Sequence, residues 1–215
     1  MSKRLLEGQV ALVTGAGRGL GRAFAERLAV LGCNIAVHGM REHGPSEYGG
    51  TATLSDVAHT IAATHGVRTM KVLGDLTRAV TVLGAAHTIF VLGLGGSFPV
   101  AAHLTYVLRK LGRRVVLLDG LGSALGEQAA CATPHDALIA ISFKTYNPDT
   151  VRLFPELVAR KVPAVVITDS LLSPLVQGAT VVFEIPDMPE AALRTMVAPM
   201  CLAQSLAVSL TLTHD

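Results

Sequence analysis

A strand that runs into a glycine loop and then into a helix is predicted twice in this chain, over residues 10–32 and 88–112. Each copy starts with a short apolar run, and each helix ends at a Leu-Gly pair, Leu31-Gly32 and Leu111-Gly112. A further apolar run follows each pair. Strands joined through a helix are typically parallel neighbours, because a parallel pair needs a long crossover connection. The repeated pattern therefore predicts a parallel sheet.

Eight apolar runs are predicted to be strands, and their near-continuous apolar character is typical of a parallel sheet covered by helices on both faces. The runs are residues 10–14, 34–38, 67–73, 88–92, 113–118, 136–142, 164–168 and 180–185. Helices are expected after both glycine loops and near residues 54–66, 148–161 and 190–210. Pro155 is expected to break or restart the helix at 148–161, since an interior proline costs about 3 kcal/mol. The predicted fold class is α/β, with doubly wound parallel sheets.

The first glycine loop follows Thr14 and has the spacing Gly15-x-x-x-Gly19-x-Gly21. Glycine permits the sharp turn and lets a pyrophosphate approach the backbone, while the amides that open the next helix favour negative charge. An alternative is that these glycines only let the helix and the strand pack closely. The helix is expected to bury one face, whose residues are Leu20, Ala23, Phe24, Leu28 and Leu31.

Composition excludes several classes of protein. Charged residues are 16% of the 215, the net charge is +2, and no block of like charge occurs, so a basic nucleic-acid arm is not expected. The chain has no Trp, six Phe and three Tyr, which disfavours a base-stacking surface. Its three cysteines form no Cys-x-x-Cys, so neither a metal site nor a disulfide framework is indicated and a reducing cytoplasm fits best.

The two ends of the chain bear on its location and partners. Residues 1–7 place an acid where a signal peptide needs its apolar stretch, so export is not expected. Residues 195–213 carry no charge but include Pro199 and Gln204, and we interpret them as a buried or dimer-packing helix rather than a membrane span. The sequence thus predicts a cytoplasmic homodimer without a membrane or nucleic-acid partner.

Residues 5–77, from Leu5-Glu-Gly-Gln through the glycine loop to Gly74-Asp-Leu-Thr77, resemble the amino-terminal part of short-chain dehydrogenases/reductases. The resemblance implies a Rossmann-like half over residues 1–77 that binds NAD(P). The residues implied to bind the cofactor are Gly15, Arg18, Gly19, Leu20, Gly21, Arg41 and Asp75, with Asp75 at the adenine.

The cofactor preference implied by this resemblance is NADP. In that family an acid ending the second strand selects NAD, whereas this sequence has His38-Gly-Met-Arg41 there. Arg18 and Arg41 would bind the 2′-phosphate, unless both are ordinary solvated arginines. The family's catalytic motifs do not appear in order. Tyr106 and Lys110 have the required spacing but lie too early in the chain, so we expect cofactor binding without turnover.

Residues 80–215 resemble the sugar isomerase (SIS) domain, particularly the effector-binding half of RpiR-type regulators. The motifs that carry the resemblance are Gly93–Ser97, Leu111–Asp119, Ala140–Phe143 followed by Asn147–Val151, and Ile167–Ser170 with Ser173-Pro-Leu175. They imply a flavodoxin-like, doubly wound domain over residues 78–215 that binds a phosphosugar.

The phosphosugar site implied by this second resemblance has two cradles. Gly95, Gly96 and Ser97 form the first, and the second is a longer version of the family's loop with Ser142, Lys144, Thr145 and Thr150. An alternative is that Ser142 and Thr150 only cap a helix begun at Asn147-Pro148. Glu127, His103 and His135 are the candidate isomerase bases, but each is better interpreted as a surface or packing residue.

The sequence therefore predicts a noncatalytic phosphosugar-binding module joined to a partial NAD(P)-binding unit, with no metal. The alternatives are an NADP-dependent short-chain oxidoreductase and a sugar-phosphate isomerase. Whether the join is a natural fusion or an engineered chimera, and whether the strands form one sheet or two, stays open at this stage.

Overall fold

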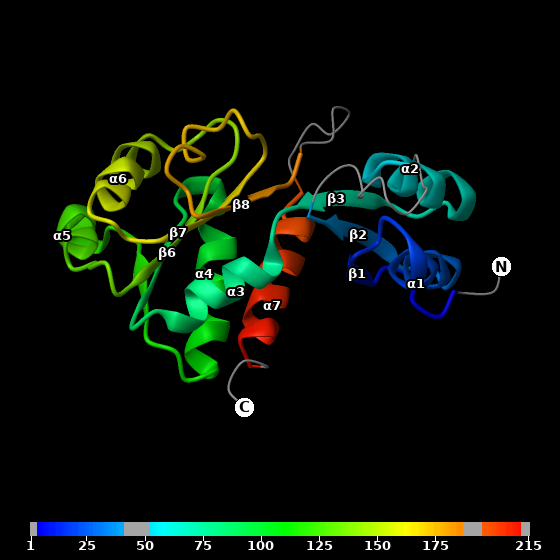
Figure 1. Cartoon of the computed structure of the whole chain (residues 1–215), viewed down its shortest axis with the longest axis horizontal. Helices are drawn as coiled ribbons and strands as arrows, with labels where there is room; N and C mark the ends of the chain where they lie inside the picture. The colour runs from blue at the N-terminus through cyan, green and yellow to red at the C-terminus, as the bar shows by residue number, and fades with distance from the viewer. Residues whose placement is uncertain (1–3, 41–51, 187–194, 212–215) are drawn as a thin grey trace. The chain divides into compact units, whose positions relative to one another are not determined.

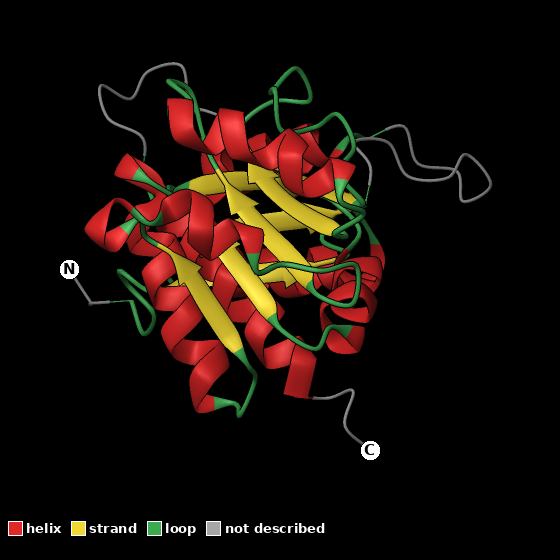
Figure 2. Ribbon diagram, turned by 90° about the vertical axis from the view of Figure 1, so that its left-hand side faces the viewer, coloured by secondary structure: helices red, strands yellow, loops and turns green. Residues whose placement is uncertain are grey.

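A computed structural model describes residues 4–40, 52–186 and 195–211; the remaining residues are drawn in grey in Figure 1. The chain forms two compact units. The first comprises Met1–Gly74 and Glu190–Leu202, and the second Asp75–Pro189 and Ala203–Asp215. Figure 2 shows the strands in yellow flanked by helices in red. Within each unit every strand pairing is parallel, so the predicted α/β fold is confirmed.

The first unit contains three parallel strands in the order β1-β2-β3. Its elements are β1 (Val10–Thr14), α1 (Gly19–Val30), β2 (Asn34–Gly39), α2 (Leu54–His65) and β3 (Thr69–Leu73). α1 and α2 pack together on Ile35 and Val37 of β2, which are fully buried. This is the strand–helix–strand–helix–strand arrangement of one mononucleotide-binding half.

Local signals in the sequence account for the ends of α2. Thr53 and Asp56 form a reciprocal capping box, in which each side chain accepts a hydrogen bond from the other's backbone N–H. The helix ends at Gly66, whose φ of +63° is the left-handed conformation that favours glycine.

The second unit contains five parallel strands in the order β8-β7-β6-β4-β5. Its strands are β4 (Ile89–Leu92), β5 (Val115–Leu118), β6 (Ala137–Ile141), β7 (Ala164–Thr168) and β8 (Val181–Glu184). Its helices are α3 (Leu76–Ala85), α4 (Phe98–Lys110), α5 (Leu125–Ala130) and α6 (Pro148–Ala159), with short 3-10 turns η2 (Gly95–Ser97) and η3 (Leu121–Ser123).

Helices cover both faces of this second sheet. On one face Phe90 and Leu138 pack against Leu153, Phe154 and Leu157 of α6, all of them buried. α4 lies on the other side of β6 and β7 from α5 and α6 (Figure 1). The sheet is therefore doubly wound, and in such sheets ligands bind beyond the carboxyl ends of the strands rather than on the covered faces.

The face of α1 that the sequence predicted to be buried is exposed over the first half of the helix, whereas Leu28 of the same face packs against the core. Leu20 is 77% exposed and Phe24 is 61% exposed, whereas the buried residues of the helix are Ala25 and Ala29. Leu20 and Phe24 lie one turn apart, so the helical spacing was predicted correctly but their burial was not. Small alanine side chains let α1 approach β1 and β2 closely, and this packing outweighs the larger apolar area of the other face.

Helices α3 and α5 were not predicted, and the expected break at Pro155 does not occur. In α3 the buried residues Ala79, Val80 and Leu83 follow helical spacing, and the Asp75 side chain caps the helix by accepting from Arg78 N at 2.9 Å. α6 continues through Pro155 to Ala159. Burial of the apolar face of α6 offsets the hydrogen bond that Pro155 cannot donate.

The uncharged carboxy-terminal segment forms α7 (Val197–Thr211). Seven residues of this helix are buried within one chain, namely Ala198, Pro199, Leu202, Ala203, Leu206, Ala207 and Leu210. The helix therefore does not by itself require a partner, and the homodimer stays a prediction. Among the described helices, none has the length and hydropathy needed to cross a membrane.

Gly21→Ala should destabilise the first unit by about 1–3 kcal/mol, as overpacked sites do. A Cβ at residue 21 would overlap Gly15 O, a backbone atom that cannot move without opening the loop. Gly17→Ala is the matched control in the same loop, because its Cβ would lie 3.6 Å from Leu54 Cδ1. Urea denaturation monitored by circular dichroism measures both. Equal stability of the two variants would contradict the packing described here.

Candidate functional site

The strand order of the second unit brings two loops to one edge of the sheet. β4 pairs with β5 on one side and with β6 on the other, and Leu92 is in register with Ala140. The chain leaves β4 towards β5 and leaves β6 towards β7, so the two connections diverge. In open α/β sheets the crevice at the carboxyl ends of such strands is where ligands bind. The loops at residues 93–97 and 142–147 flank this crevice.

The first loop needs glycine to turn back onto α4. A Cβ at Gly93 would lie 2.8 Å from Ala101 Cβ, and Gly95 has a φ of +57°. Gly95 and Gly96 are exposed and open the short 3-10 turn, where the first N–H groups have no partner within the helix. Ser97 is only 5% exposed, and its hydroxyl makes no capping hydrogen bond to α4. The loop thus presents two amides and a hydroxyl.

The second loop leads into α6, which is capped by Asn147. The Asn147 side chain accepts from Asp149 N at 3.0 Å and from Thr150 N at 3.3 Å. Two amides at the start of α6 are therefore already paired, and Pro148 has none. Ser142, 2% exposed, does not cap the helix; its N–H donates to Ile167 O of β7 at 3.1 Å. Anion recognition here must rely on side chains more than on helix amides.

The side-chain hydroxyl of Thr150 is buried without a hydrogen-bond partner among the described residues. It is fully buried in the first turn of α6, and among the described residues no group pairs with its Oγ1. Leaving a hydroxyl unpaired in the interior costs about 1–3 kcal/mol. A Cβ on Gly95 would lie 3.7 Å from Asn147 Nδ2, so the first loop adjoins the cap of α6. Thr150 lies in the helical turn that this cap begins.

The sequence analysis missed Asp169, the residue that follows β7. Its carboxylate accepts from Lys144 N at 3.1 Å, from Tyr146 Oη at 2.9 Å and from Thr168 Oγ1 at 3.3 Å. Burial, and then the Asp169 carboxylate, raise the pKa of Tyr146. The signal was available, because a carboxylate directly after a buried parallel strand lies at the carboxyl edge of the sheet.

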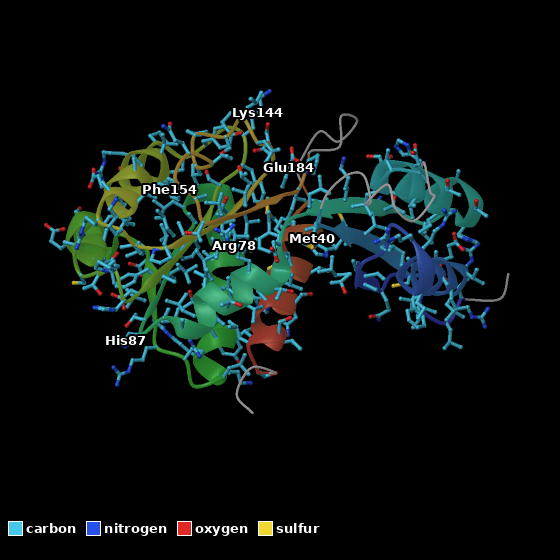
Figure 3. All side chains as sticks on the ribbon, in the orientation of Figure 1. Met40, Arg78, His87, Lys144, Phe154 and Glu184 are labelled. Atoms are coloured by element: carbon cyan, nitrogen blue, oxygen red, sulfur yellow. The ribbon has the colours of Figure 1, made fainter. Side chains whose placement is uncertain are left out.

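Lys144 and Thr145, the remaining predicted residues of the second cradle, are both exposed. Figure 3 places Lys144 and His87 at opposite ends of the second unit. His87 stacks on His135, with ring centroids 5.6 Å apart. His135 therefore lies at the end of the unit away from the crevice.

The other candidate bases have ordinary surroundings. His103 of α4 lies 3.2 Å from Gln204 Oε1 of α7, and Glu127 is exposed on α5. Tyr106 and Lys110, which have the spacing of a catalytic pair, lie on the surface of α4. Tyr106 is 58% exposed, and Lys110 Nζ lies 5.3 Å from the centre of its ring. In the parts of the chain that the structure describes, no group of three metal-ligating side chains occurs.

The predicted cofactor loop of the first unit lies between β1 and α1. Gly15 and Gly19 have φ of +64° and +54°, and Gly21 lies against the Gly15 carbonyl. Arg18 is exposed at the N-cap of α1, where its side chain cannot accept a hydrogen bond, so no side chain caps this helix. Leu20 is exposed as well, while Asp75 caps α3, and Arg41 lies outside the described residues.

Comparison with known families and structures concerns mainly the second unit. The family model of the SIS domain matches residues 83–209. The RpiR transcription factor of Sphaerobacter thermophilus (sugar isomerase domain) is 28% identical, with a TM-score of 0.60 over 64% of this chain and 76% of that chain. The Vibrio vulnificus NanR protein complexed with ManNAc-6P is 24% identical, with a TM-score of 0.57 over 65% of this chain and 54% of that chain.

Curated relatives match a shorter part of the chain. Cyclohexanol dehydrogenase of a Rhodococcus species is 39% identical over 90 residues, which are 39% of this chain and 32% of that protein. The 7beta-hydroxysteroid dehydrogenase of Collinsella aerofaciens is 34% identical over 90 residues, or 42% of this chain and 29% of that protein. The chain thus spans about a third of the length of these two relatives.

Thr150→Val should leave the ligand-free protein as stable as the unsubstituted chain, or stabilise it by about 1 kcal/mol. Valine keeps the shape of the side chain and removes a buried hydroxyl that lacks a protein partner among the described residues. Thr105→Val is the matched variant, since Thr105 of α4 is also buried with an unpaired Oγ1 in that part of the chain. Thermal unfolding measures both. A loss of more than about 2 kcal/mol in Thr150→Val would mean that the hydroxyl has a structural partner.

Proposed function

The chain belongs to the SIS domain family, and from this premise we propose that its second unit binds a phosphorylated sugar in the crevice between the carboxyl ends of β4 and β6. The observation that carries the proposal is the cluster of buried hydroxyls at that edge. Ser97, Ser142 and Thr150 are 5%, 2% and 0% exposed, and Thr150 Oγ1 lacks a described partner.

The chemistry of the crevice suits a phosphate monoester. The amides of Gly95 and Gly96 and the hydroxyls of Ser97 and Ser142 are neutral donors, and Lys144 supplies a positive charge. Hydrogen bonds to an ionised acceptor are about twice as strong as those between neutral groups. A solved relative supports this choice of ligand class, since the NanR structure was determined as a complex with ManNAc-6P.

We assign binding rather than isomerisation to this site. An aldose–ketose isomerase needs a carboxylate or imidazole that can take a proton from carbon. The carboxylate beside the second loop is Asp169, and three donors already occupy its oxygens. A carboxylate whose oxygens are already bonded to donors of the loop and of β7 is poorly placed to take a proton from a sugar carbon. Turnover of a sugar phosphate by the purified protein would favour the isomerase instead.

A second candidate function is binding of NADP by the first unit. The observation in its favour is the uncapped start of α1, where the glycine conformations at positions 15 and 19 expose backbone amides to an anion. Similarity to dehydrogenases over about a third of their length is a weaker support. We propose cofactor binding without hydride transfer, because the short-chain dehydrogenase motifs for catalysis are not found in order in the sequence.

A sugar phosphate should stabilise the protein, whereas the corresponding free sugar should not, because recognition is of the phosphate. Ligand at about 100 times Kd contributes roughly 2.7 kcal/mol, which raises the melting temperature measurably. A thermal-shift panel of aldose, ketose and amino-sugar phosphates, each beside its free sugar, provides the measurement. Ser97→Ala, Ser142→Ala and Thr150→Val should each weaken binding, by about 1–3 kcal/mol for a lost bond to a charged group. Thr105→Val should bind as the unsubstituted protein does.

Arg18→Ala should weaken the binding of NADP about tenfold and leave the binding of NAD almost unchanged, since only NADP carries the 2′-phosphate. Arg22→Ala is the control on the same helix, because Arg22 Nε already pairs with Glu26 Oε1 at 2.8 Å. Isothermal titration of both cofactors measures the ratio. An equal loss for NAD and NADP in Arg18→Ala would show that Arg18 does not read the 2′-phosphate.

A further inference from the structure

Asp169 joins the second loop to the end of β7 through one carboxylate. It follows β7, it receives the backbone N–H of Lys144 on Oδ2 and the phenol of Tyr146 on Oδ1, and Thr168 adds a third donor. Lys144 and Tyr146 lie on either side of Thr145 in the second loop. A single side chain thus holds both flanks of the exposed segment that carries two of the predicted ligand-binding residues.

This segment is held at its two ends and, between them, by Asp169. Residues 142–147 have neither helical nor strand conformation, and Ser142 N and the Asn147 side chain are bound at the two ends. Between those ends the hydrogen bonds from Lys144 N and Tyr146 Oη to Asp169 fix the path of the backbone at Lys144. Charge-assisted bonds to a carboxylate are well suited to this, because they are short and stronger than neutral ones.

We infer that Asp169 is a positioning residue, which holds Lys144 and Thr145 in the geometry that binds the phosphate without touching the ligand itself. This inference rests on the proposed phosphosugar site. A carboxylate placed among phosphate-binding groups would repel a dianion if its oxygens were open. With donors from Lys144, Tyr146 and Thr168 on its oxygens, the charge of Asp169 is compensated locally.

The protein contains a matched carboxylate at the opposite end of β6. Asp136 accepts from Thr133 N at 2.8 Å, from Thr133 Oγ1 at 2.7 Å and from Thr88 N at 3.0 Å, so it joins two segments through three donors, as Asp169 does. Burial would raise the pKa of Asp136, but the bonds from Thr133 and Thr88 outweigh it and lower that pKa. A strand of five residues, about 16 Å, separates the two ends of β6.

The inference is tested with three variants, Asp169→Asn, Tyr146→Phe and the control Asp136→Asn, and with two readouts. The first is amide hydrogen exchange at Lys144 in the ligand-free protein, which Asp169→Asn should accelerate at least tenfold, because asparagine has one neutral acceptor oxygen for the two donors Lys144 N–H and Tyr146 Oη. Asp136→Asn should leave that exchange rate unchanged and lower the melting temperature.

The second readout is the Kd for sugar 6-phosphates, with inorganic phosphate titrated as a further probe. Asp169→Asn should raise the Kd for a sugar phosphate about ten- to hundredfold, and Tyr146→Phe should raise it about two- to tenfold. The Kd of Asp136→Asn should stay within about twofold of that of the unsubstituted protein. A purely structural role would lower stability in both aspartate variants without separating their Kd values.

The outcomes distinguish this inference from the proposed function. If the unsubstituted protein binds no sugar phosphate in the panel, the proposed function fails and the positioning role fails with it. If it binds, but both Asp169→Asn and Tyr146→Phe bind equally well, only the positioning role is overturned. Unprotected exchange at Lys144 in the unsubstituted protein would also overturn it.

Discussion

The pairing of β4 with a parallel strand on each edge is the constraint on which the second unit depends. β5 and β6 occupy those edges, so the chain must cross from one side of β4 to the other between them. The loops after β4 and β6 consequently leave the sheet in opposite directions, and such a switch point is where open α/β sheets bind their ligands. This pairing, rather than any local preference of the loops, brings Ser97 and Ser142 to the same end of the sheet, and the pairing of β6 with β7 adds Asp169 there.

The starts of α1 and α6 offer different groups to an anion. In the first unit no side chain caps α1, so its opening amides are available to an anion. In the second unit Asn147 already caps α6, and the donors that remain near that helix are hydroxyls and a lysine. The first arrangement suits a diphosphate that needs many backbone amides, and the second suits a single phosphate group.

Sequence reasoning predicted the strands well because buried parallel strands are short, apolar and followed by glycine or a polar residue. It failed where tertiary packing decides between equivalent local choices. The face of α1 could not be chosen from spacing alone, since Ala25 and Ala29 have helical spacing just as Leu20 and Phe24 do. The predicted helix break at Pro155 was wrong for a related reason. The free-energy cost of an interior proline is local and visible in the sequence, whereas the burial against the sheet that offsets this cost is not.

The candidate site was predicted in part. Motif resemblance suggested Ser97, Ser142 and Thr150 as ligand-binding residues, whereas the capping of α6 was assigned, as an alternative, to Ser142 and Thr150 and not to Asn147, which caps the helix. Asp169 was quoted within a motif and given no role, because its partners Lys144 and Tyr146 lie more than twenty residues away along the chain. Contacts at that separation follow from the order of β6 and β7 in the sheet, which the sequence does not specify.

The most direct test of the central claim is a two-dimensional amide NMR titration of the whole protein with a sugar phosphate. The largest shift changes should fall on the amides of Gly95, Gly96 and Thr150, with smaller changes at Lys144 and none at the His87 end of the second unit. The free sugar should leave these amides unmoved. Changes confined to Gly15–Gly21, or spread without a maximum at residues 93–97 and 142–150, would contradict the assignment of the crevice between β4 and β6.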